Sequence, residues 1–346
     1  MMRDFSDLKN CYIIAEAGVN HNADVNLAIK LVDAAKESGA NAVKFQLFKI
    51  KEQVSNLAIN APYQRKGSGE ESMLAMAKHY DLEWNAHYKI RDYCRKVGID
   101  YLSSCCDIDA IDFLVDELEA NAIKISSGEI TNLRLLKHAS KKNVPIILST
   151  GMASLEEIDI AVDEIKRHHK STLIILHCVS NYPTDEDKLN LSTITTLKNK
   201  YGLQIGFSDH SLGNHAAIAA IALGSKVIEK HFTLDKSLPG PDHFMALNPG
   251  ELKEFVSIIR NTEKMVGKEG KFVSKEEEEM KAIFRRGLIS SKKIKKGEKI
   301  DYDNTALKRP VLGIDAIYFD QVIGRRVLKD LEVDSPISWD LLESSQ

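Results

Sequence analysis

Two histidines, His210 and His231, stand where two short, largely apolar runs end, and these residue types at this spacing are suited to binding a metal. Residues 203–207 and 226–228 read as strands, and the Ala-rich stretch at 216–223 between them is typical of a packed helix. A strand–helix–strand unit makes parallel strands about 4.8 Å apart, with their downstream ends on one side. Two imidazoles there can share a divalent metal ion. The alternative is a pair of core or loop histidines that never meet, and the pair alone does not decide.

The elements that would position these histidines alternate between strand and helix along the chain. Strand-like runs occupy residues 12–15, 42–47, 99–102, 122–125, 145–148 and 173–176, ahead of the two histidine strands. Apolar residues at helical spacing follow most runs, and a last helix begins at Asn248 and Pro249. After the second strand we expect a longer, polar connection that leads to a helix over residues 84–96. Eight such units predict a (β/α)₈ TIM barrel. A doubly wound open sheet is the alternative, but no glycine-rich dinucleotide fingerprint follows the first strand.

Polar or charged side chains stand at the downstream end of nearly every predicted strand. One polar strand end is an ordinary turn, but eight of them on the carboxyl face of a barrel make a site. These residues are Glu16, Lys44, Gln46, Ser104, Lys124, Ser127, Glu129, Ser149, His177, Ser208, Asp209 and His231. The pattern therefore predicts an active site on that face.

The composition limits the classes of protein to consider. With 346 residues, 43% of them hydrophobic and 28% charged, the chain is long enough for one large soluble domain and a small one. A net charge of −3 and a pI near 6.4 favour neither nucleic acid nor an anionic membrane as partner. No apolar run approaches the roughly 20 residues of a membrane span, and no signal-peptide core follows Met1. Five cysteines without framework spacing indicate a cytoplasmic protein.

The composition and the periodicity of the sequence change after Gly267. Residues 268–286 are rich in charge and predict a linker or a solvated helix. From residue 287 to 346 the helical period is lost, and short strand-like pieces at 288–290, 299–300 and 306–307 predict a small β domain. Residues 293–298 are faintly repeated in 327–332. We therefore divide the chain into a catalytic barrel (1–267), a linker (268–286) and a small domain (287–346).

Seven short motifs, in order along the chain, resemble those of the sialic acid synthase family. They are residues 14–22, Val43-Lys44-Phe45-Gln46, Lys124-Ile125-Ser126-Ser127-Gly128-Glu129, Leu148-Ser149-Thr150-Gly151-Met152, Ser208-Asp209-His210, Glu229-Lys230-His231-Phe232 and Gly240-Pro241-Asp242-His243. The resemblance runs from about residue 12 to residue 330 and extends to the N,N'-diacetyllegionaminate synthases. It implies a TIM barrel followed by a SAF domain similar to type III antifreeze protein.

The resemblance also implies a reaction and its partners. Members of the family condense phosphoenolpyruvate with an N-acetylated mannosamine-type sugar, such as N-acetylmannosamine, to give N-acetylneuraminate and phosphate. They need a divalent metal, Mn²⁺ or alternatively Mg²⁺ or Co²⁺, and form domain-swapped homodimers. The metal would act as a Lewis acid on the sugar aldehyde.

Site residues are carried over position by position. His210 and His231 match the metal ligands. Glu129 matches a carboxylate that handles protons when water adds, and we expect burial among apolar strands to tune its acidity. Glu16 is a second catalytic candidate. Arg309 matches an arginine that reaches the N-acetyl group in the partner's site. The remaining substrate-binding positions are Lys44, Gln46, Ser104, Lys124, Ser127, Ser149, Ser180, Tyr182, Ser208 and Asp242.

Some positions depart from the family, and some roles stay open. Ser104-Cys105-Cys106 replaces the usual Thr-Pro-Phe, which keeps a hydroxyl but loses a proline. Ser180 stands where relatives carry asparagine or threonine. Asp209 is expected to orient His210 or its strand end. His21 and His243 have no assigned role.

Three functions compete at this point. The first is a sialic acid synthase, whose acceptor is N-acetylmannosamine, its 6-phosphate or 2,4-diacetamido-2,4,6-trideoxymannose. The second is another phosphoenolpyruvate aldol synthase that makes a shorter acid. The third is a non-catalytic binding protein, against which the intact Lys44, Lys124, Glu129, His210 and His231 argue.

Overall fold

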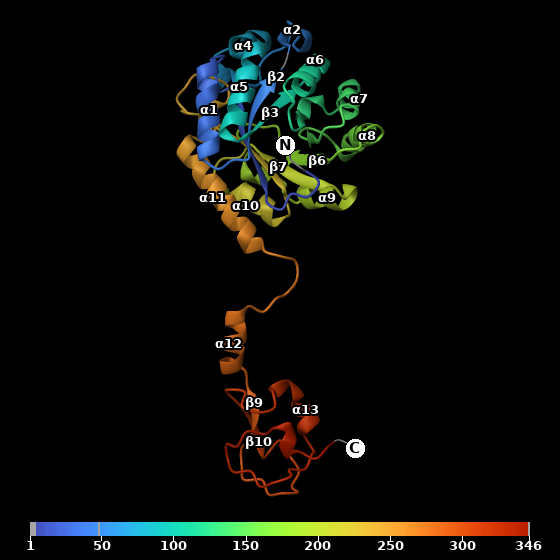
Figure 1. Ribbon diagram of the computed structural model, residues 1–346, viewed down its shortest axis with the longest axis vertical. Helices are drawn as coiled ribbons and strands as arrows, with labels where there is room; N and C mark the ends of the chain where they lie inside the picture. The colour runs from blue at the N-terminus through green and yellow to red at the C-terminus, as the bar shows by residue number, and fades with distance from the viewer. Residues whose placement is uncertain (1–4, 48, 345–346) are drawn as a thin grey trace. The chain divides into compact units, whose positions relative to one another are not determined.

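The computed structural model describes residues 5–47 and 49–344, and the chain divides into two compact units, Met1–Gly267 and Lys268–Gln346 (Figure 1). The outermost residues of the ranges predicted for the barrel and the small domain, 1–4 and 345–346, lie outside the described residues. Each unit has its own buried core.

The first unit is a closed barrel of eight parallel strands in which β1 pairs with both β2 and β8, so the predicted (β/α)₈ fold is confirmed. The strands are β1 Tyr12–Gly18, β2 Ala42–Leu47, β3 Asp100–Cys105, β4 Ile123–Ile125, β5 Ile146–Ser149, β6 Leu173–Cys178, β7 Gln204–Asp209 and β8 Val227–His231. Nearly every strand residue is buried, as expected where helices cover the outside and side chains fill the inside.

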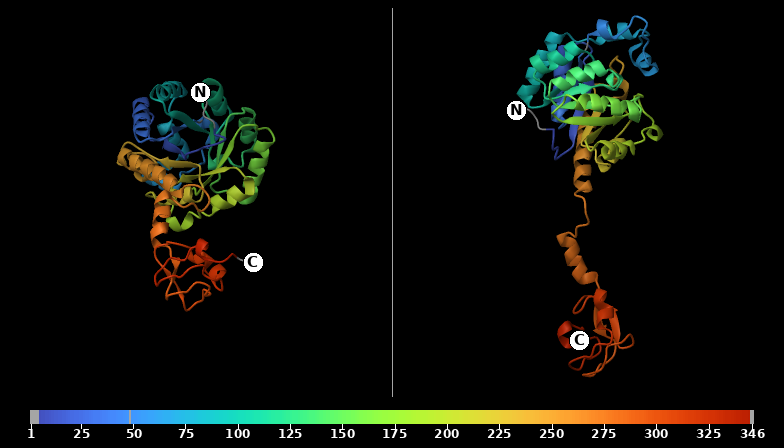
Figure 2. Two further views of the ribbon diagram at one scale, coloured as in Figure 1. Left: turned by 60° about the horizontal axis from the view of Figure 1, so that its bottom comes forward. Right: turned by 90° about the vertical axis from the view of Figure 1, so that its right-hand side faces the viewer.

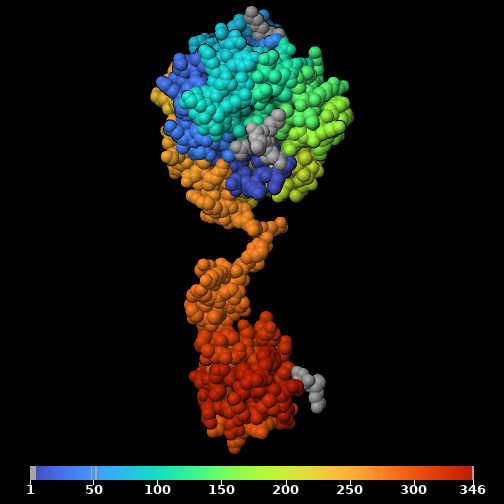
Figure 3. Space-filling model, in the orientation of Figure 1, coloured from blue at the N-terminus to red at the C-terminus, as the bar shows by residue number. Residues whose placement is uncertain are grey.

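Helices lie around the barrel strands (Figure 1), and on the face shown in Figure 3 their side chains cover the strands. They are α1 Val25–Glu37, α5 Trp84–Val97, α6 Ile108–Asp112 with the π-helical turn η1 Phe113–Glu117, α7 Leu133–Lys141, α8 Leu155–Lys166, α9 Thr193–Tyr201, α10 His215–Ala222 and α11 Pro249–Val266. A capping box of Ser154 and Glu157 begins α8, and Asn248 with Glu251 begins α11 in the same way.

Side chains alternate between two cores along each strand. Ile13 and Ala15 of β1 face the helices, whereas Tyr12 and Ile14 belong to a cluster that fills the barrel near the start of the strands. Phe5 belongs to that same inner cluster, so the chain before β1 packs against the barrel. Inside the barrel, polar residues replace apolar ones toward the carboxyl ends of the strands. The side chains that can bind or react with a substrate are therefore gathered at that end.

The connection between β2 and α5, expected as a longer polar segment, contains three short helices, α2 Ile50–Gln53, α3 Pro62–Ser68 and α4 Met73–Tyr80. These helices stand at one end of the barrel (Figures 1 and 2). The polar composition gave no sign of them, because only some of the apolar residues of this segment are buried: Met76 and Tyr80 are, whereas Leu57 and Ile59 are exposed.

The second unit contains α12 Lys275–Phe284, the antiparallel pair of β9 Gly287–Ser290 and β10 Thr305–Lys308, the short helix α13 Phe319–Val322, and isolated bridges. The two faintly repeated segments lie antiparallel, and Ile294 and Leu331 exchange backbone hydrogen bonds of 2.9 and 2.8 Å. Its core is formed by Leu288, Ile294, Ile300, Ile314, Val322, Val327, Leu331, Ile337, Leu341 and Leu342.

Candidate active site

A cavity of about 580 Å³ opens at the carboxyl end of the barrel strands. Fourteen of the fifteen predicted site residues line it; the exception is Arg309, which lies in the second unit. The strand register explains the gathering, because Glu16 pairs with both Lys44 and His231, Gln46 with Ser104, and Ser104 with Lys124. Residues far apart in sequence therefore meet on one face.

Two buried lysines lie at the floor of the cavity, each bonded to a serine. Lys44 Nζ donates to Ser104 Oγ at 2.8 Å, and Lys124 Nζ donates to Ser149 Oγ at 2.7 Å. Both lysines are only 2–3% exposed. Ammonium groups held in so little water bind a compact anion strongly, because solvent screens the attraction weakly. We call this group, with Ser127 and Ser208, the anion cradle.

The serine side of the cradle depends on a close approach at Gly151. The Gly151 amide donates to Ser127 Oγ at 3.0 Å, and Ser127 Oγ lies 3.1 Å from Cys178 Sγ. A Cβ atom at position 151 would stand 2.3 Å from Ser180 Oγ and 2.9 Å from both Cys178 Sγ and Ser127 Oγ. Only glycine fits there without displacing these side chains.

Buried carboxylates surround the lysines. Glu16 Oε2 lies 2.7 Å from Lys44 Nζ, and Glu229 Oε2 lies 3.7 Å from Lys44 Nζ and 3.9 Å from Lys124 Nζ. Burial raises the pKa of Glu16 to about 7 against the opposing pull of Lys44. For Glu229 burial also opposes ionisation, but Lys124 and Lys44 outweigh it and lower the pKa to about 2. Burial raises the pKa of Asp242 to about 6. Glu16 and Asp242 can therefore exchange protons near neutral pH.

The two histidines predicted as metal ligands lie side by side, with ring centroids 5.6 Å apart. Burial lowers the pKa of His210 to about 4 and that of His231 well below its ordinary value, so both rings are neutral at pH 7. His210 Nδ1 lies 2.8 Å from the Val179 carbonyl, to which it donates, and this leaves Nε2 with its lone pair. The Tyr182 ring packs on His210 with centroids 4.0 Å apart.

A second polar group lies over β1, β2 and β8. The position that a Cβ of Gly18 would take is 3.3 Å from Glu16 Oε1, 3.5 Å from Gln46 Nε2 and 3.6 Å from Asp242 Oδ2. These three side chains therefore converge, as expected for residues that contact one substrate. Arg309 is exposed in the second unit, where its guanidinium lies over the Phe284 ring at 5.8 Å.

One expectation needs correction. Glu129 lines the cavity but is not buried among apolar strands, because it stands in the 3₁₀ turn Ser127–Glu129 and accepts a hydrogen bond from Asn132 at 2.8 Å. For Asp209 the second of its two expected roles is seen: it makes no hydrogen bond to the His210 ring between the described residues, but its Oδ1 accepts from the Ser211 amide at 2.9 Å and the Ser211 hydroxyl at 2.6 Å at the end of its strand. Its Oδ2 forms a buried ion pair of 2.8 Å with Lys230, which ties β7 to β8 beside both histidines.

Sequence comparison places the chain in a known family. The sequence model of the NeuB family matches residues 31–271, and that of the SAF domain matches residues 285–343. The chain belongs to the NeuB family.

Relatives of this NeuB family member that are 31–43% identical to it over nearly its whole length include several named synthases, so the chain is an enzyme of the synthase type, as expected. The N,N'-diacetyllegionaminic acid synthase of Campylobacter jejuni is 43% identical over 333 residues, covering 95% of this chain and 99% of the relative. That of Legionella pneumophila is 40% identical over 339 residues, covering 96% and 95%. The crystal structure of N-acetylneuraminic acid synthetase from Leptospira borgpetersenii in complex with citrate is 34% identical with a TM-score of 0.72, covering 79% of this chain and 90% of that one.

The residues of this NeuB family site fit a divalent metal with two protein ligands. His231 Nδ1 is buried and has no hydrogen-bond partner among the residues that the structure describes, and Asp242 Oδ2 lies 3.9 Å from it. Over the described residues, no group of three or more His, Cys, Asp or Glu side chains is arranged to hold a metal. Two neutral imidazole nitrogens leave the other coordination positions to water and substrate, as catalytic sites require.

Sequence reasoning about this NeuB family member missed Glu229. Its Oε1 accepts a hydrogen bond from Ser208 Oγ at 2.8 Å, and its Oε2, which accepts none, lies between the two lysines. The signal was present, because a strand alternates its side chains and Glu229 stands two residues before His231. Sequence reasoning also missed the apolar residues that the β2–α5 connection contributes to the cavity.

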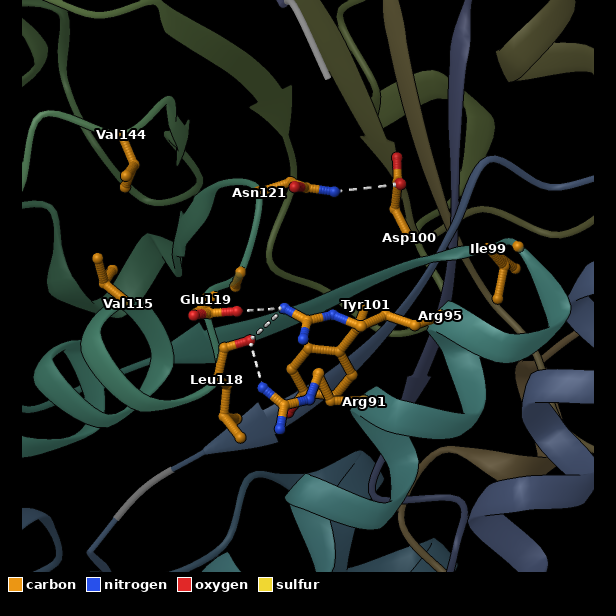
Figure 4. A pocket seen from close by; sticks show the side chains of 12 residues that line it. Arg91, Arg95, Ile99, Asp100, Tyr101, Val115, Leu118, Glu119, Asn121 and Val144 are labelled. Atoms are coloured by element: carbon orange, nitrogen blue, oxygen red, sulfur yellow. Dashed lines mark hydrogen bonds and ion pairs between the residues drawn. The ribbon is translucent and has the colours of Figure 1, made fainter. Parts of the chain in front are cut away.

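A second cavity, of about 890 Å³, lies at the opposite, amino-terminal end of β3 and β4 (Figure 4). Arg91 and Arg95 point toward the end of the π-helical turn, where both donate to the Leu118 carbonyl and Arg95 pairs with Glu119. Their charge stabilises the carboxyl end of a helix. These arginines are engaged with the protein itself, and we assign this cavity no chemistry.

No helix in the described parts of the chain is long and apolar enough to cross a membrane.

Proposed function

We propose that this enzyme condenses phosphoenolpyruvate with an N-acetylated mannosamine-type sugar to give a nonulosonic acid and phosphate. The observation that carries the proposal is the anion cradle: two buried ammonium groups, bonded to serines, beside two neutral imidazoles. A carboxylate and a phosphate on one small molecule need such a set of donors.

The cradle would hold phosphoenolpyruvate with C3 facing the sugar aldehyde. Lys44, Lys124 and the hydroxyls of Ser104, Ser127, Ser149 and Ser208 bind its phosphate and carboxylate, with Ser180 at the edge. A divalent cation on His210 and His231, Mn²⁺ or alternatively Mg²⁺ or Co²⁺, would supply Lewis acidity to the aldehyde oxygen when bound.

The reaction then requires three bond changes. C3 of phosphoenolpyruvate forms a bond to the aldehyde carbon, whose oxygen takes up a proton. Water adds to C2 and loses a proton, and phosphate leaves by C–O cleavage, which yields the keto acid. Glu16, with a pKa near 7, suits the first proton transfer, and Glu129, at the open side of the cradle, suits the second.

The acceptor determines the product. N-acetylmannosamine would give N-acetylneuraminate, and 2,4-diacetamido-2,4,6-trideoxymannose would give N,N'-diacetyllegionaminate. Both carry the N-acetyl group that Gln46, Tyr182 and Asp242 would help to orient. The names of the 40% and 43% identical relatives favour the second acceptor.

We also propose a homodimer that exchanges its second units, so that Arg309 of each chain reaches the N-acetyl group in the other chain's site. The support is an apolar face of α12, where Met280, Ile283 and Phe284 are exposed by 47%, 54% and 57%. Such a face is expected to be covered in an assembly.

The experiment is a phosphate-release assay with purified enzyme, Mn²⁺, phosphoenolpyruvate and each acceptor in turn, with the product identified by mass. We expect phosphate only when both substrates are present, in a ratio of about one to one with the nine-carbon acid. Phosphate release that is independent of any sugar acceptor would contradict the proposal.

A further inference from the structure

We propose that the β2–α5 connection forms an apolar wall that selects a 6-deoxy acceptor over a 6-hydroxy or 6-phosphate sugar. This inference rests on the proposed function and specifies its acceptor class. The term acceptor wall is used for the cavity-lining residues Val19, Val54, Ala61, Tyr63, Met73, Met76, Ala77 and Tyr80.

The acceptor wall is apolar and well packed. Val19, Met76 and Tyr80 form a buried cluster with exposed fractions of 9%, 8% and 5%. Tyr63 stacks on Tyr182 with ring centroids 4.7 Å apart. From the connection only Gln53 and Gln64 add amide groups to the lining, and none of its described lining residues is charged. Apart from these amides and the phenol hydroxyls of Tyr63 and Tyr80, the lining of the connection is aliphatic or thioether surface, which favours contact with a methyl group over burial of a hydroxyl.

The wall stands over the sugar side of the cavity rather than over the cradle. Val19 directly follows β1 and Gly18, around which Glu16, Gln46 and Asp242 converge. The connection is tied to the loop that carries Asp242, because the Gly240 amide donates to the Gly67 carbonyl at 3.3 Å.

That contact is tight enough to fix the wall in place. A Cβ at position 67 would stand 2.6 Å from the Gly240 carbonyl oxygen and 2.8 Å from that of Pro241, both of them backbone atoms. The absence of a side chain at Gly67 therefore allows the connection to close over β1, β2 and β8.

Chemistry orients the acceptor in this space. Its C1 must lie at the floor, beside the cradle and the two imidazoles, because C1 forms the new bond. The cradle serines stand on β3, β5 and β7 and in the turn after β4, whereas Glu16, Gln46 and Asp242 converge around Gly18, so we place the rest of the sugar on that second side. Its far carbon, C6, then meets the acceptor wall.

Charge separates the three acceptor classes. Of the described residues that line the cavity, only Lys44 and Lys124 carry an ammonium or guanidinium group, and both lie at the floor with buried carboxylates beside them. A 6-phosphate would reach the wall without a cation to pair with. Placing a 6-hydroxyl against the wall costs less binding free energy than placing a phosphate there, and placing a methyl group costs none.

The test compares acceptors that differ at one atom. Values of kcat/KM are measured by phosphate release with N-acetylmannosamine, its 6-deoxy analogue and its 6-phosphate, and with 2,4-diacetamido-2,4,6-trideoxymannose. We expect the 6-deoxy sugar to exceed the 6-hydroxy sugar by roughly 10- to 200-fold, the range that a pocket of this kind provides. We expect the 6-phosphate to be the poorest acceptor.

Three variants assign the preference to the wall. Met73→Gln and Met76→Gln, nearly isosteric, should narrow the preference for the 6-deoxy sugar several-fold and leave the KM for phosphoenolpyruvate unchanged. Met73→Lys should raise kcat/KM for the 6-phosphate. Met265→Gln, at an exposed position of α11, is the matched control and should alter neither. Met73 is only partly buried, so its variants test the wall even if Met76→Gln does not fold.

The outcomes separate the two levels of inference. Equal kcat/KM for 6-deoxy and 6-hydroxy sugars, or a preference for the 6-phosphate, would overturn the acceptor wall and leave the proposed reaction intact. An unchanged preference for the 6-deoxy sugar in the Met73 variants would also overturn the acceptor wall. Failure of every sugar to release phosphate would remove both the proposed function and this inference.

Discussion

Substituting Gly151 by alanine should damage the anion cradle without changing any group that contacts substrate. The added Cβ would stand 2.3 Å from Ser180 Oγ, and 2.9 Å from both Ser127 Oγ and Cys178 Sγ. Backbone strain is not the cause, because Gly151 is not among the residues with positive φ. The effect must come from displaced side chains.

The size of the effect follows from these distances. Side-chain contacts of a Cβ below 3.0 Å are essentially never observed, so Ser180 Oγ must retreat by at least 3.0 − 2.3 = 0.7 Å. A displacement approaching 1 Å in a catalytic site costs on the order of 100-fold in rate. Overpacking of this kind also destabilises a protein by about 1–3 kcal/mol. We therefore expect kcat/KM for phosphoenolpyruvate to fall about 100-fold and the Tm to fall by a few degrees.

The assay is steady-state phosphate release with phosphoenolpyruvate varied, together with thermal unfolding. Gly250→Ala is the control, because its Cβ would meet nothing nearer than Asn248 Oδ1 at 3.4 Å and alanine favours the helix α11. A second variant, Ser180→Ala on the Gly151→Ala background, removes the atom at 2.3 Å and should recover part of the lost stability. A folded Gly151→Ala enzyme with unchanged kinetics would refute the reasoning, as would a double variant no more stable than the single one.

Four further outcomes are expected. Lys124→Ala removes a charge-assisted contact of about 1.5–3 kcal/mol and should raise the KM for phosphoenolpyruvate about 10- to 150-fold, while Mn²⁺ affinity measured by calorimetry is kept. His231→Ala should abolish both turnover and high-affinity Mn²⁺ binding and leave the far-UV spectrum unchanged; full activity in the metal-stripped variant would exclude the assignment. Arg309→Ala should raise the KM for the sugar and leave the KM for phosphoenolpyruvate unchanged. If the second units are exchanged, a heterodimer of Arg309→Ala and Lys124→Ala chains contains one site with both residues intact, so mixing the two variants should restore activity. Heterodimers that form without regaining activity would disprove the exchange. Burial lowers the pKa of His87 to about 3, so between pH 6.5 and about 3 the unfolded state binds a proton that the folded state does not. The free energy of unfolding should therefore fall by about 1.4 kcal/mol for each pH unit below 6.5, as urea unfolding at pH 7 and pH 5 would measure. The fall should be smaller in His87→Gln and unchanged in His79→Gln, whose histidine is exposed.

The barrel could be predicted from the sequence because its signals are local. Each strand reads as an apolar run, and each strand end carries its polar residue in the sequence itself. A closed parallel barrel brings all carboxyl ends to one face, so fourteen residues could be expected at one cavity before their distances were known.

The parts that were missed depend on packing between distant segments. Glu129 looked buried because an apolar strand precedes it, but the 3₁₀ turn carries it outward. Of the two roles expected for Asp209, the hydrogen bonds to Ser211 support the one at the strand end, and what was missed is its ion pair with Lys230, because strand alternation turns it to the other face. The polar character of residues 51–72 hid the apolar lining that the folded connection provides.

The hydrogen bond between Gly67 and Gly240 joins two parts of the enzyme, the barrel and the β2–α5 connection, in which substitutions have different consequences. Glu16, Lys44 and Lys124 sit on strands that are paired on both sides, so a substitution there disturbs several neighbours at once. Apart from Val19, the acceptor wall lies on the β2–α5 connection, whose helices span residues 50–80 and which the Gly67–Gly240 hydrogen bond joins to the loop of Asp242. Such a connection can diverge, or be exchanged between relatives as a cassette, without disturbing the floor. Specificity for new acceptors can thus evolve while the catalytic residues at the floor of the cavity stay unchanged.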